Sequence, residues 1–369
     1  MQDFLRQTIS ELVAIPSPSG QEQGVADYVF DHLKRAGLAP ERDAEDNVWA
    51  EVGPGGAGRL LHVNGHLDTV VPVDGWVTDP LKPTVQGERL YGLGSTDCKA
   101  GLAAMLWLAP RVRPAVRVRF SFTVCEEGIG HAKENGSRRM AAAGGDWAIT
   151  VEPSCLPDGP CISIGTQGHA RAVVSFTGKA AHSSRPDLGE NAVTAAARFC
   201  LELEKLNAAF PEQRLYGGVL ARATVAPTKI AGGKLSNIIP DSCEVTVSRR
   251  LAPGERRETF QAELDRLLAG AQAGYQLFSD GPCAMVNIGG PLFAAARRAI
   301  AEVTGAERMA FQRGRTDAVI YAGAGMDTIT IGPGQIGQSH TANEHVNLRA
   351  AADCVRVLEK VINGLPEAG

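Results

Sequence analysis

The sequence predicts an α/β domain that is interrupted by a smaller, inserted α+β domain. At 369 residues the chain is longer than a single hydrophobic core usually becomes, which favours two domains. Its first and last thirds alternate β-rich runs with helical segments, as in a mostly parallel sheet covered by helices. The middle third follows the order strand, helix, strand, strand, helix, strand, which indicates a small sheet with two helices on one face. We place the parts at 1–166, 167–281 and 282–369.

The first part begins with two amphipathic helices. Segment 3–13 gathers its apolar residues on one helical face and stops before Pro16, and a second helix over 22–36 ends at Gly37. Beyond them the chain alternates apolar and polar residues with the period of a strand. Strands are predicted at 47–52, 59–64 and 116–124, with an apolar helix over 99–108.

The rest of the chain changes style twice. The middle part has the alternation of antiparallel strands, and the last part returns to helices around a strand. Middle strands are predicted at 170–177, 221–230 and 242–249, with helices over 191–206 and 255–269. The last part is predicted to hold helix 291–304, strand 328–331 and helix 348–363.

Composition excludes several classes of partner. Net charge is −4 and no basic stripe occurs, so nucleic acid is not an expected partner. The N-terminus lacks the features of a signal peptide, and no apolar run is long enough to span a membrane. The eight cysteines form no CxxC pair and are expected to be reduced, mostly buried thiols. We therefore expect a cytoplasmic protein without a membrane partner.

Five polar motifs lie at or just beyond the C-terminal ends of predicted strands, where open α/β sheets place their sites. Each has an ordinary explanation when taken singly: a buried histidine beside a capping aspartate, a helix cap, or a solvated strand end. Two histidines and four carboxylates at one edge, however, are a ligand set suited to a pair of zinc ions. These six residues are His66, Asp97, Glu126, Glu127, Glu152 and His340, and Asp68 accompanies His66 in its motif.

Two of these motifs make more specific predictions. His66 and Asp68 are two residues apart, so on a strand both side chains project from one face, and Asp68 can orient His66. The turn before Asp97 contains Gly92 and Gly94 but completes no phosphate-binding fingerprint. A nucleotide-binding α/β enzyme is therefore a weaker alternative.

Jointly, the motifs resemble the co-catalytic zinc family of acetylornithine deacetylase, succinyl-diaminopimelate desuccinylase, aminoacylase and glutamate carboxypeptidase. The resemblance spans essentially the whole chain and is closest to the acetylornithine deacetylase-like members. It implies a zinc-peptidase-like catalytic domain with a mixed sheet and flanking helices, interrupted by a ferredoxin-like dimerisation domain. It also implies two zinc ions, replaceable by cobalt or manganese. His66 and Glu152 match ligands of the first ion, Glu127 and His340 match ligands of the second, and Asp97 matches the carboxylate that bridges both.

The resemblance gives the remaining residues of the motifs a role as well. Glu126 in CEEG resembles the general base, and Asp68 resembles the acid that orients His66. In SHTANE the family histidine precedes the asparagine–glutamate pair, which favours His340 over His345 as the ligand.

Further residues are implied for substrate binding. His182 in FTGKAAHSSRP resembles a histidine that reaches across a dimer to steady the tetrahedral intermediate, and Asn237 in LSNIIPD resembles a substrate contact. Arg250, rather than Arg249, is placed to grip the substrate carboxylate, a role that suits a planar guanidinium. A charge at a strand end is the alternative for Arg250.

The glycine-rich segment GPGQIG, with Gly332 and Gly334, is expected to let the backbone approach the substrate closely. Altogether, the resemblance implies a cytoplasmic homodimer that hydrolyses the amide of an N-acyl-L-amino acid in amino-acid biosynthesis. A di-zinc carboxypeptidase or dipeptidase acting on short peptides is the main enzymatic alternative. A catalytically silent relative that serves as a binding protein is a further one, although all six metal-binding or base positions are intact.

Overall fold

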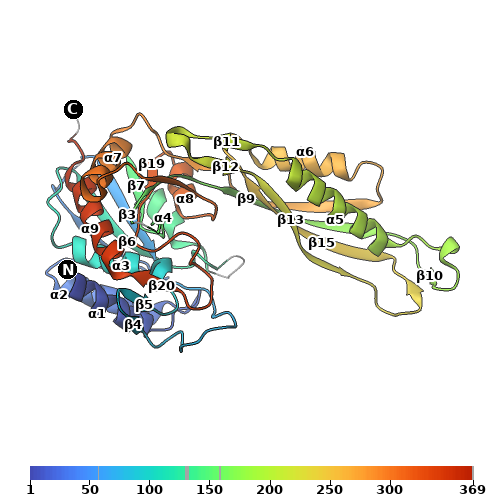
Figure 1. Cartoon of the computed structure of the whole chain (residues 1–369), viewed down its shortest axis with the longest axis horizontal. Coiled ribbons are helices and arrows are strands. Elements are labelled where there is room, and N and C mark those ends of the chain that lie inside the picture. Colours follow the sequence, from blue (N-terminus) through green and yellow to red (C-terminus); the bar gives the residue numbers. More distant parts are fainter. Residues whose placement is uncertain (57, 129–132, 158, 368–369) are drawn as a thin grey trace. The chain divides into compact units, whose positions relative to one another are not determined.

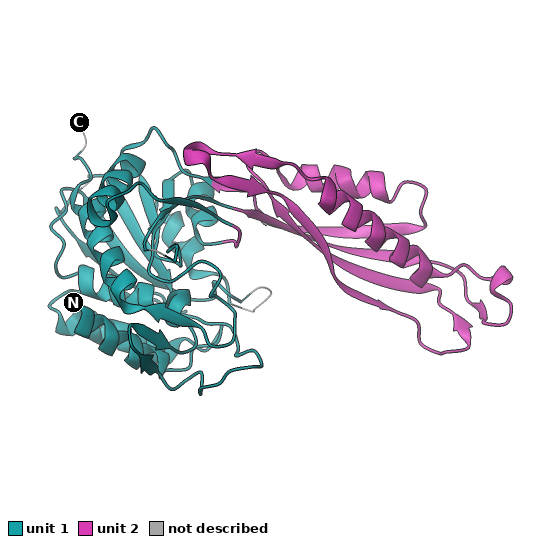
Figure 2. Ribbon diagram, in the orientation of Figure 1, with its two compact units in different colours: residues 1–166, 285–312, 316–369 teal, residues 167–284, 313–315 magenta. Residues whose placement is uncertain are grey.

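The computed structural model describes residues 1–56, 58–128, 133–157 and 159–367. The chain divides into two compact units, shown in Figure 2. The first unit is built from segments at both ends of the chain, and the second is built from its middle. The first comprises residues 1–166, 285–312 and 316–369, and the second comprises residues 167–284 and 313–315.

A mixed nine-stranded sheet is the centre of the first unit among the described residues (Figure 1). Its strand order is β1-β2-β6-β3-β7-β19-β8-β17, with β18 beside β8. β6, β3, β7 and β19 are parallel neighbours, whereas β2 joins β6 antiparallel. The bounds are β1 Glu41–Arg42, β2 Val48–Val52, β3 Leu60–His66, β6 Arg117–Thr123, β7 Trp147–Thr150, β8 Ile162–Thr166, β17 Ala284–Met285, β18 Met309–Gln312 and β19 Asp327–Thr330.

The helices of the first unit follow the apolar pattern of their sequences. α3 is apolar all round and almost entirely buried, and it contacts α1, α9 and β3. α9 is amphipathic and is capped at its N-terminus by Asn347, whose side chain accepts a hydrogen bond from the N–H of Ala350. The bounds are α1 Gln2–Val13, α2 Gln23–Arg35, α3 Ala100–Leu108, α4 Gly136–Ala142, α7 Pro291–Thr304, α8 Ala318–Gly323 and α9 Leu348–Asn363.

The second unit is an antiparallel sheet in the order β13-β15-β9-β16, with α5 and α6 on one face. Burial alternates along β15, and its inward residues meet those of the two helices in one core. The predicted order of strand, helix, strand, strand, helix, strand is confirmed. The bounds are β9 Gly168–Thr177, α5 Ala192–Ala209, β13 Thr224–Gly232, β15 Ser242–Leu251, α6 Arg257–Leu267 and β16 Ala273–Gly281.

Several short ladders were absent from the sequence-based assignment. A three-stranded sheet, β20-β5-β4, joins residues near the end of the chain to a hairpin in its first quarter. The predicted strand over 221–230 is in fact two strands, because β12 ends at Arg222 and β13 begins at Thr224. The short strands are β4 Thr84–Gln86, β5 Arg89–Tyr91, β10 Ala181–His182, β11 Glu212–Arg214, β12 Leu220–Arg222, β14 Ile238–Ile239 and β20 His345–Asn347.

No helix in the described part of the chain is long and apolar enough to cross a membrane.

Candidate active site

Parallel strands bring the predicted ligands of the first unit to one edge of the sheet. His66 is the last residue of β3, and β6 and β7 are its two parallel neighbours. Glu126 follows the end of β6, and Glu152 follows the end of β7. Because the carboxyl ends of parallel strands lie at the same edge, these side chains converge there.

Asp97 lies between the two predicted histidine ligands. Its Oδ1 is 3.0 Å from Nε2 of His66, and its Oδ2 is 3.7 Å from Nε2 of His340. The same nitrogen of His340 is 2.7 Å from Oε1 of Glu127. One carboxylate thus faces two imidazoles with different oxygens, which is the geometry required of a group that bridges two ions.

Two groups of side chains bring their ligand atoms within 4.8 Å of one another and could each hold a metal ion. One is Asp97 with Glu127 and His340, the set expected around the second ion. The other is His66 with Glu126 and Glu127. Glu126 thus lies within reach of the first ion's histidine, where a general base has to be.

Glu152 is buried and near both His66 and Asp97, whose charges act on its carboxylate. Its Oε1 accepts a hydrogen bond of 3.2 Å from the N–H of Asp317. The structure therefore brings all the predicted metal ligands into one cluster, and the assignment of each to an ion stays a prediction.

The tautomer of His66 fits metal binding. Its Nδ1 lies 2.9 Å from the main-chain oxygen of Asp68, which can only accept, so Nδ1 carries a proton. In the neutral ring the lone pair is then on Nε2, the nitrogen that faces Asp97. A main-chain carbonyl that accepts the proton of one ring nitrogen, and so leaves the other nitrogen for the metal, is typical of metal-binding histidines.

Asp68 lies beyond the end of β3, so the expectation that both residues share one strand face is wrong. Its carboxylate oxygen is 3.5 Å from Nδ1 of His66, farther than its own main-chain oxygen. The carboxylate instead accepts main-chain N–H groups of Glu126 and Glu127, each at 3.0 Å, and the hydroxyl of Ser19 at 2.6 Å. Asp68 therefore orients His66 through its backbone and the glutamate pair through its side chain.

The electrostatics of the cluster call for a cation. Burial, followed by the charges of Glu152, Asp317 and Glu127, raises the pKa of Glu126 well above its ordinary value. Burial and neighbouring aspartates likewise raise the pKa of Glu152. Several buried carboxylates this close together cannot all be ionised at low cost unless a positive charge lies among them. The donor set, with imidazole and carboxylate ligands, fits divalent zinc, cobalt or manganese.

Sequence reasoning missed three buried carboxylates that support the cluster. Asp317 is fully buried, and its side chain accepts hydrogen bonds from the side chains of Asn64, Asn135 and Ser137. Glu22 accepts the main-chain N–H of Cys125, next to Glu126. Glu344, noticed in the sequence only as a neighbour of His340, accepts three main-chain N–H groups near Asp97. The criterion used for the predicted ligands, a polar residue just after a predicted strand, does not pick out any of these three carboxylates.

The two glycines of GPGQIG have a packing reason in the structure. A Cβ on Gly332 would lie 2.5 Å from the main-chain oxygen of Glu152. Gly334 has a φ of +112° and approaches the main-chain oxygen of Thr96, which a Cβ would meet at 2.9 Å. Both glycines therefore let backbone segments of the cluster approach each other, and their contact with substrate stays a prediction.

The remaining predicted residues lie in the second unit. His182 and Asn237 are neighbours there, because β10 pairs with β14 and the N–H of Ser183 donates to the oxygen of Asn237. Arg249 is fully buried and paired with Glu255 and Glu263, so it has a structural role. Arg250 lies on the opposite face of β15, beside His169 of β9. Their roles in binding substrate stay predictions.

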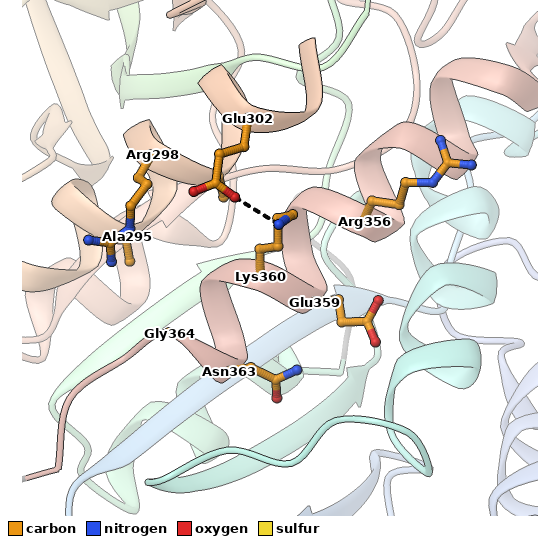
Figure 3. Close-up of a pocket in the computed structure, with 9 residues that line it drawn as sticks. Ala295, Arg298, Glu302, Arg356, Glu359, Lys360, Asn363 and Gly364 are labelled. Atoms are coloured by element: carbon orange, nitrogen blue, oxygen red, sulfur yellow. Dashed lines mark hydrogen bonds and ion pairs between the residues drawn. The ribbon is translucent and has the colours of Figure 1, made fainter. Parts of the chain in front are cut away.

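The cluster is distinct from the cleft shown in Figure 3. This cleft, of about 490 Å³, lies between α7 and α9. Its lining is charged, and Nζ of Lys360 is 2.7 Å from Glu302 within it. It contains none of the predicted ligands.

Comparison with known proteins gives one consistent result. The model of the peptidase family M20/M25/M40 matches residues 62–364. A putative succinyl-diaminopimelate desuccinylase of Mycobacterium tuberculosis is 31% identical over 94% of this chain and 95% of its own length. An acetylornithine deacetylase of Myxococcus xanthus is 30% identical over 97% of this chain and 96% of its own.

Solved structures share the fold at lower identity. An aminopeptidase of Bacillus cereus has a TM-score of 0.76 at 21% identity, covering 99% of both chains. An M20 family metallo-carboxypeptidase of Sulfolobus solfataricus has a TM-score of 0.77 at 18% identity, covering 98% of both chains. The fold class and the resemblance predicted from the motifs are thereby confirmed. The chain belongs to the metallohydrolases of peptidase family M20/M25/M40.

Proposed function

We propose that this chain hydrolyses the amide bond of an N-acyl-L-amino acid, using two zinc ions and Glu126 as the general base. The observation that carries the proposal is the placement of Asp97 between His66 and His340, with Glu126 beside them. The relatives in Mycobacterium tuberculosis and Myxococcus xanthus bear the names of a desuccinylase and a deacetylase, which supports an acyl-amino-acid substrate.

The ions would be held by His66, Asp97, Glu127, Glu152 and His340. When bound, they supply Lewis-acid polarisation of the scissile carbonyl and make a water more acidic. Glu126 takes the proton of the attacking water and later gives it to the leaving amine. The main-chain N–H of Glu126 donates a hydrogen bond to the carboxylate of Asp68, which holds the backbone of the general base in place.

His182 is suited to stabilise the oxyanion that forms on the substrate. The main-chain N–H of Ser184 points at Nδ1 of His182 at 3.2 Å, so this nitrogen is an acceptor. Neutral His182 then carries its proton on Nε2, which can donate to a developing negative charge. One such donor is typically worth about 3–4 kcal/mol in the transition state. Asn237 is a second contact near the same place, and Arg250 would hold the substrate carboxylate.

A di-zinc carboxypeptidase or dipeptidase is the alternative, favoured by one specific observation. Solved structures with the same fold include an aminopeptidase and a metallo-carboxypeptidase that cover nearly the whole length of this chain. These likenesses lie below the identity at which substrate can be carried over, and function depends on the pocket rather than the fold.

We also propose that the protein is a cytoplasmic homodimer that joins through its second unit. Large apolar side chains are exposed there, and a contact between two copies would cover them. They include Leu188, Leu201, Ile230, Leu235 and Ile238. Burial of these residues against a second copy would remove them from water. The eight cysteines, all of them among the described residues, are reduced thiols that form no disulfide, which suits a reducing compartment.

The deciding experiment is hydrolysis of a panel containing N-acetylornithine, N-succinyl-diaminopimelate, N-acetylmethionine and Ala-Gly, with and without chelator. Chelator-sensitive release from an acyl-amino acid supports the proposal, and release from Ala-Gly alone moves the chain to the peptidases. Glu126→Gln removes the base but keeps a side chain of the same size, so turnover should fall about 100- to 10,000-fold while metal content is unchanged. Turnover retained by Glu126→Gln refutes the assignment of the base.

A further inference from the structure

Glu344 is a buried carboxylate that holds the turn carrying Asp97. Only 1% of its surface is exposed. Its Oε1 accepts the main-chain N–H groups of Thr96 and Asp97 at 2.8 and 3.0 Å, and its Oε2 accepts that of Gly94 at 3.0 Å. Both oxygens of the carboxylate are therefore occupied by backbone donors of a single turn.

This turn has few other ways to satisfy its backbone. Thr96 and Asp97 lie in the single helical turn Ser95–Lys99, and Gly94 is the residue just before it, so their N–H groups have no partner within that turn. Gly94 has a φ of +74°, and a Cβ there would meet Thr69 at 2.5 Å, so the turn is tight as well as buried. A buried donor left unpaired is destabilising, and Glu344 provides an acceptor for three such donors.

The same contact joins two loops that carry predicted ligands. Glu344 is in the segment that contains His340, and the hydroxyl of Thr96 donates to the oxygen of His345 at 2.7 Å. β20, which begins at His345, also pairs with β5 just before the turn. The position of Asp97 relative to His340 is therefore determined by Glu344 more directly than by the central sheet.

We propose that Glu344 is a positioning residue for Asp97: it fixes the turn so that one carboxylate reaches both ion positions. The inference rests on the proposed two-metal function and assigns Glu344 no contact with substrate or ions. An amide cannot replace it, because one of its two polar atoms is a donor and would face a backbone donor.

Metal binding by purified variants tests the proposal without any substrate. Glu344→Gln removes one acceptor and the charge, whereas Glu344→Asp keeps the charge and shortens the reach. Asp327→Asn is the matched control: Asp327 also accepts a main-chain N–H, from Asn287 at 3.2 Å, but at the opposite end of β19. Affinities for both ions are measured by chelator competition, and the cobalt-loaded absorption spectrum reports their coordination.

Both Glu344 variants should bind the two ions 10- to 100-fold more weakly, with a changed cobalt spectrum, while Asp327→Asn matches the unaltered protein. Unaltered affinity and spectrum in Glu344→Gln overturn the proposal. If Glu344→Gln does not fold, the test rests on Glu344→Asp. A metal affinity of Glu344→Asp equal to that of the unaltered protein then overturns the proposal that the length of the Glu344 side chain positions Asp97. Failure of the unaltered protein to bind two ions or to hydrolyse any substrate would instead count against the proposed function.

Discussion

The side chain of Asp68 should stabilise the loop of Glu126 and Glu127 more than the ring of His66, which lies 3.5 Å from its carboxylate. Asp68→Asn keeps the size of the side chain and leaves its main-chain oxygen, the partner of His66, in place. The asparagine has one acceptor oxygen where the carboxylate has two. Its amide nitrogen must therefore face the N–H of Glu126 or of Glu127.

The magnitude follows from the bonds that are lost. Hydrogen bonds to a charged group contribute about 1.5–3 kcal/mol each, and an unpaired buried donor costs about 1–3 kcal/mol. Asp68 is 1% exposed, so solvent cannot take over as the partner. We expect Asp68→Asn to lower the free energy of unfolding of the metal-loaded protein by about 3 kcal/mol. Turnover should fall 10- to 100-fold, as for other partners of metal ligands.

Urea unfolding of metal-loaded protein measures the first effect, and chelator competition separates the two ions. The ion that Glu127 is expected to hold should be weakened more than the ion on His66. Asp146→Asn is the control, because Asp146 accepts the N–H of Leu60 at the opposite end of β3. A greater loss at the His66 ion, or unchanged stability, would refute the role given to the carboxylate.

Two further predictions concern the second unit and the effect of pH. Arg249→Ala should cost about 3 kcal/mol in urea unfolding, because it leaves Glu255 and Glu263 without their cation, whereas Arg250→Ala should mainly raise KM. Equal effects of the two variants on KM would contradict this division. Chelated protein should lose stability as pH rises, because burial and the charge of Asp97 raise the pKa of Glu344 from 4.5 to about 7. Because the folded protein binds the proton of Glu344 more tightly than the unfolded chain does, protonation of Glu344 stabilises the fold. The free energy of unfolding therefore falls by about 3 kcal/mol as the pH rises from 4.5 to about 7. Melting temperatures of chelated and metal-loaded protein across this range test the prediction, and parallel curves would contradict it.

The parts of the fold that the sequence predicted are those with long, regular patterns. The strand predicted from the alternation over 116–124 corresponds to β6, and the helix predicted from the apolar run over 99–108 corresponds to α3. Strands of two or three residues, such as β10 and β20, are too short to show a period. They pair segments far apart in the chain, so only the folded structure reveals them.

The candidate site divides in the same way. Its predicted ligands follow strands or glycine-rich turns and could be located from those positions. The partners of Asp68 could not, because main-chain N–H groups leave no pattern in the sequence. Nor could Asp317, whose network reaches Asn64, 253 positions away. Such contacts depend on how separate loops meet at the edge of the sheet.

The most direct test of the central claim is a zinc titration of chelated protein, with hydrolysis of the best acyl-amino acid of the panel followed at each step. The account predicts that turnover needs added zinc and reaches its maximum when two ions are bound per chain. Full turnover in metal-free protein, or no hydrolysis of the panel with two ions bound, would contradict it.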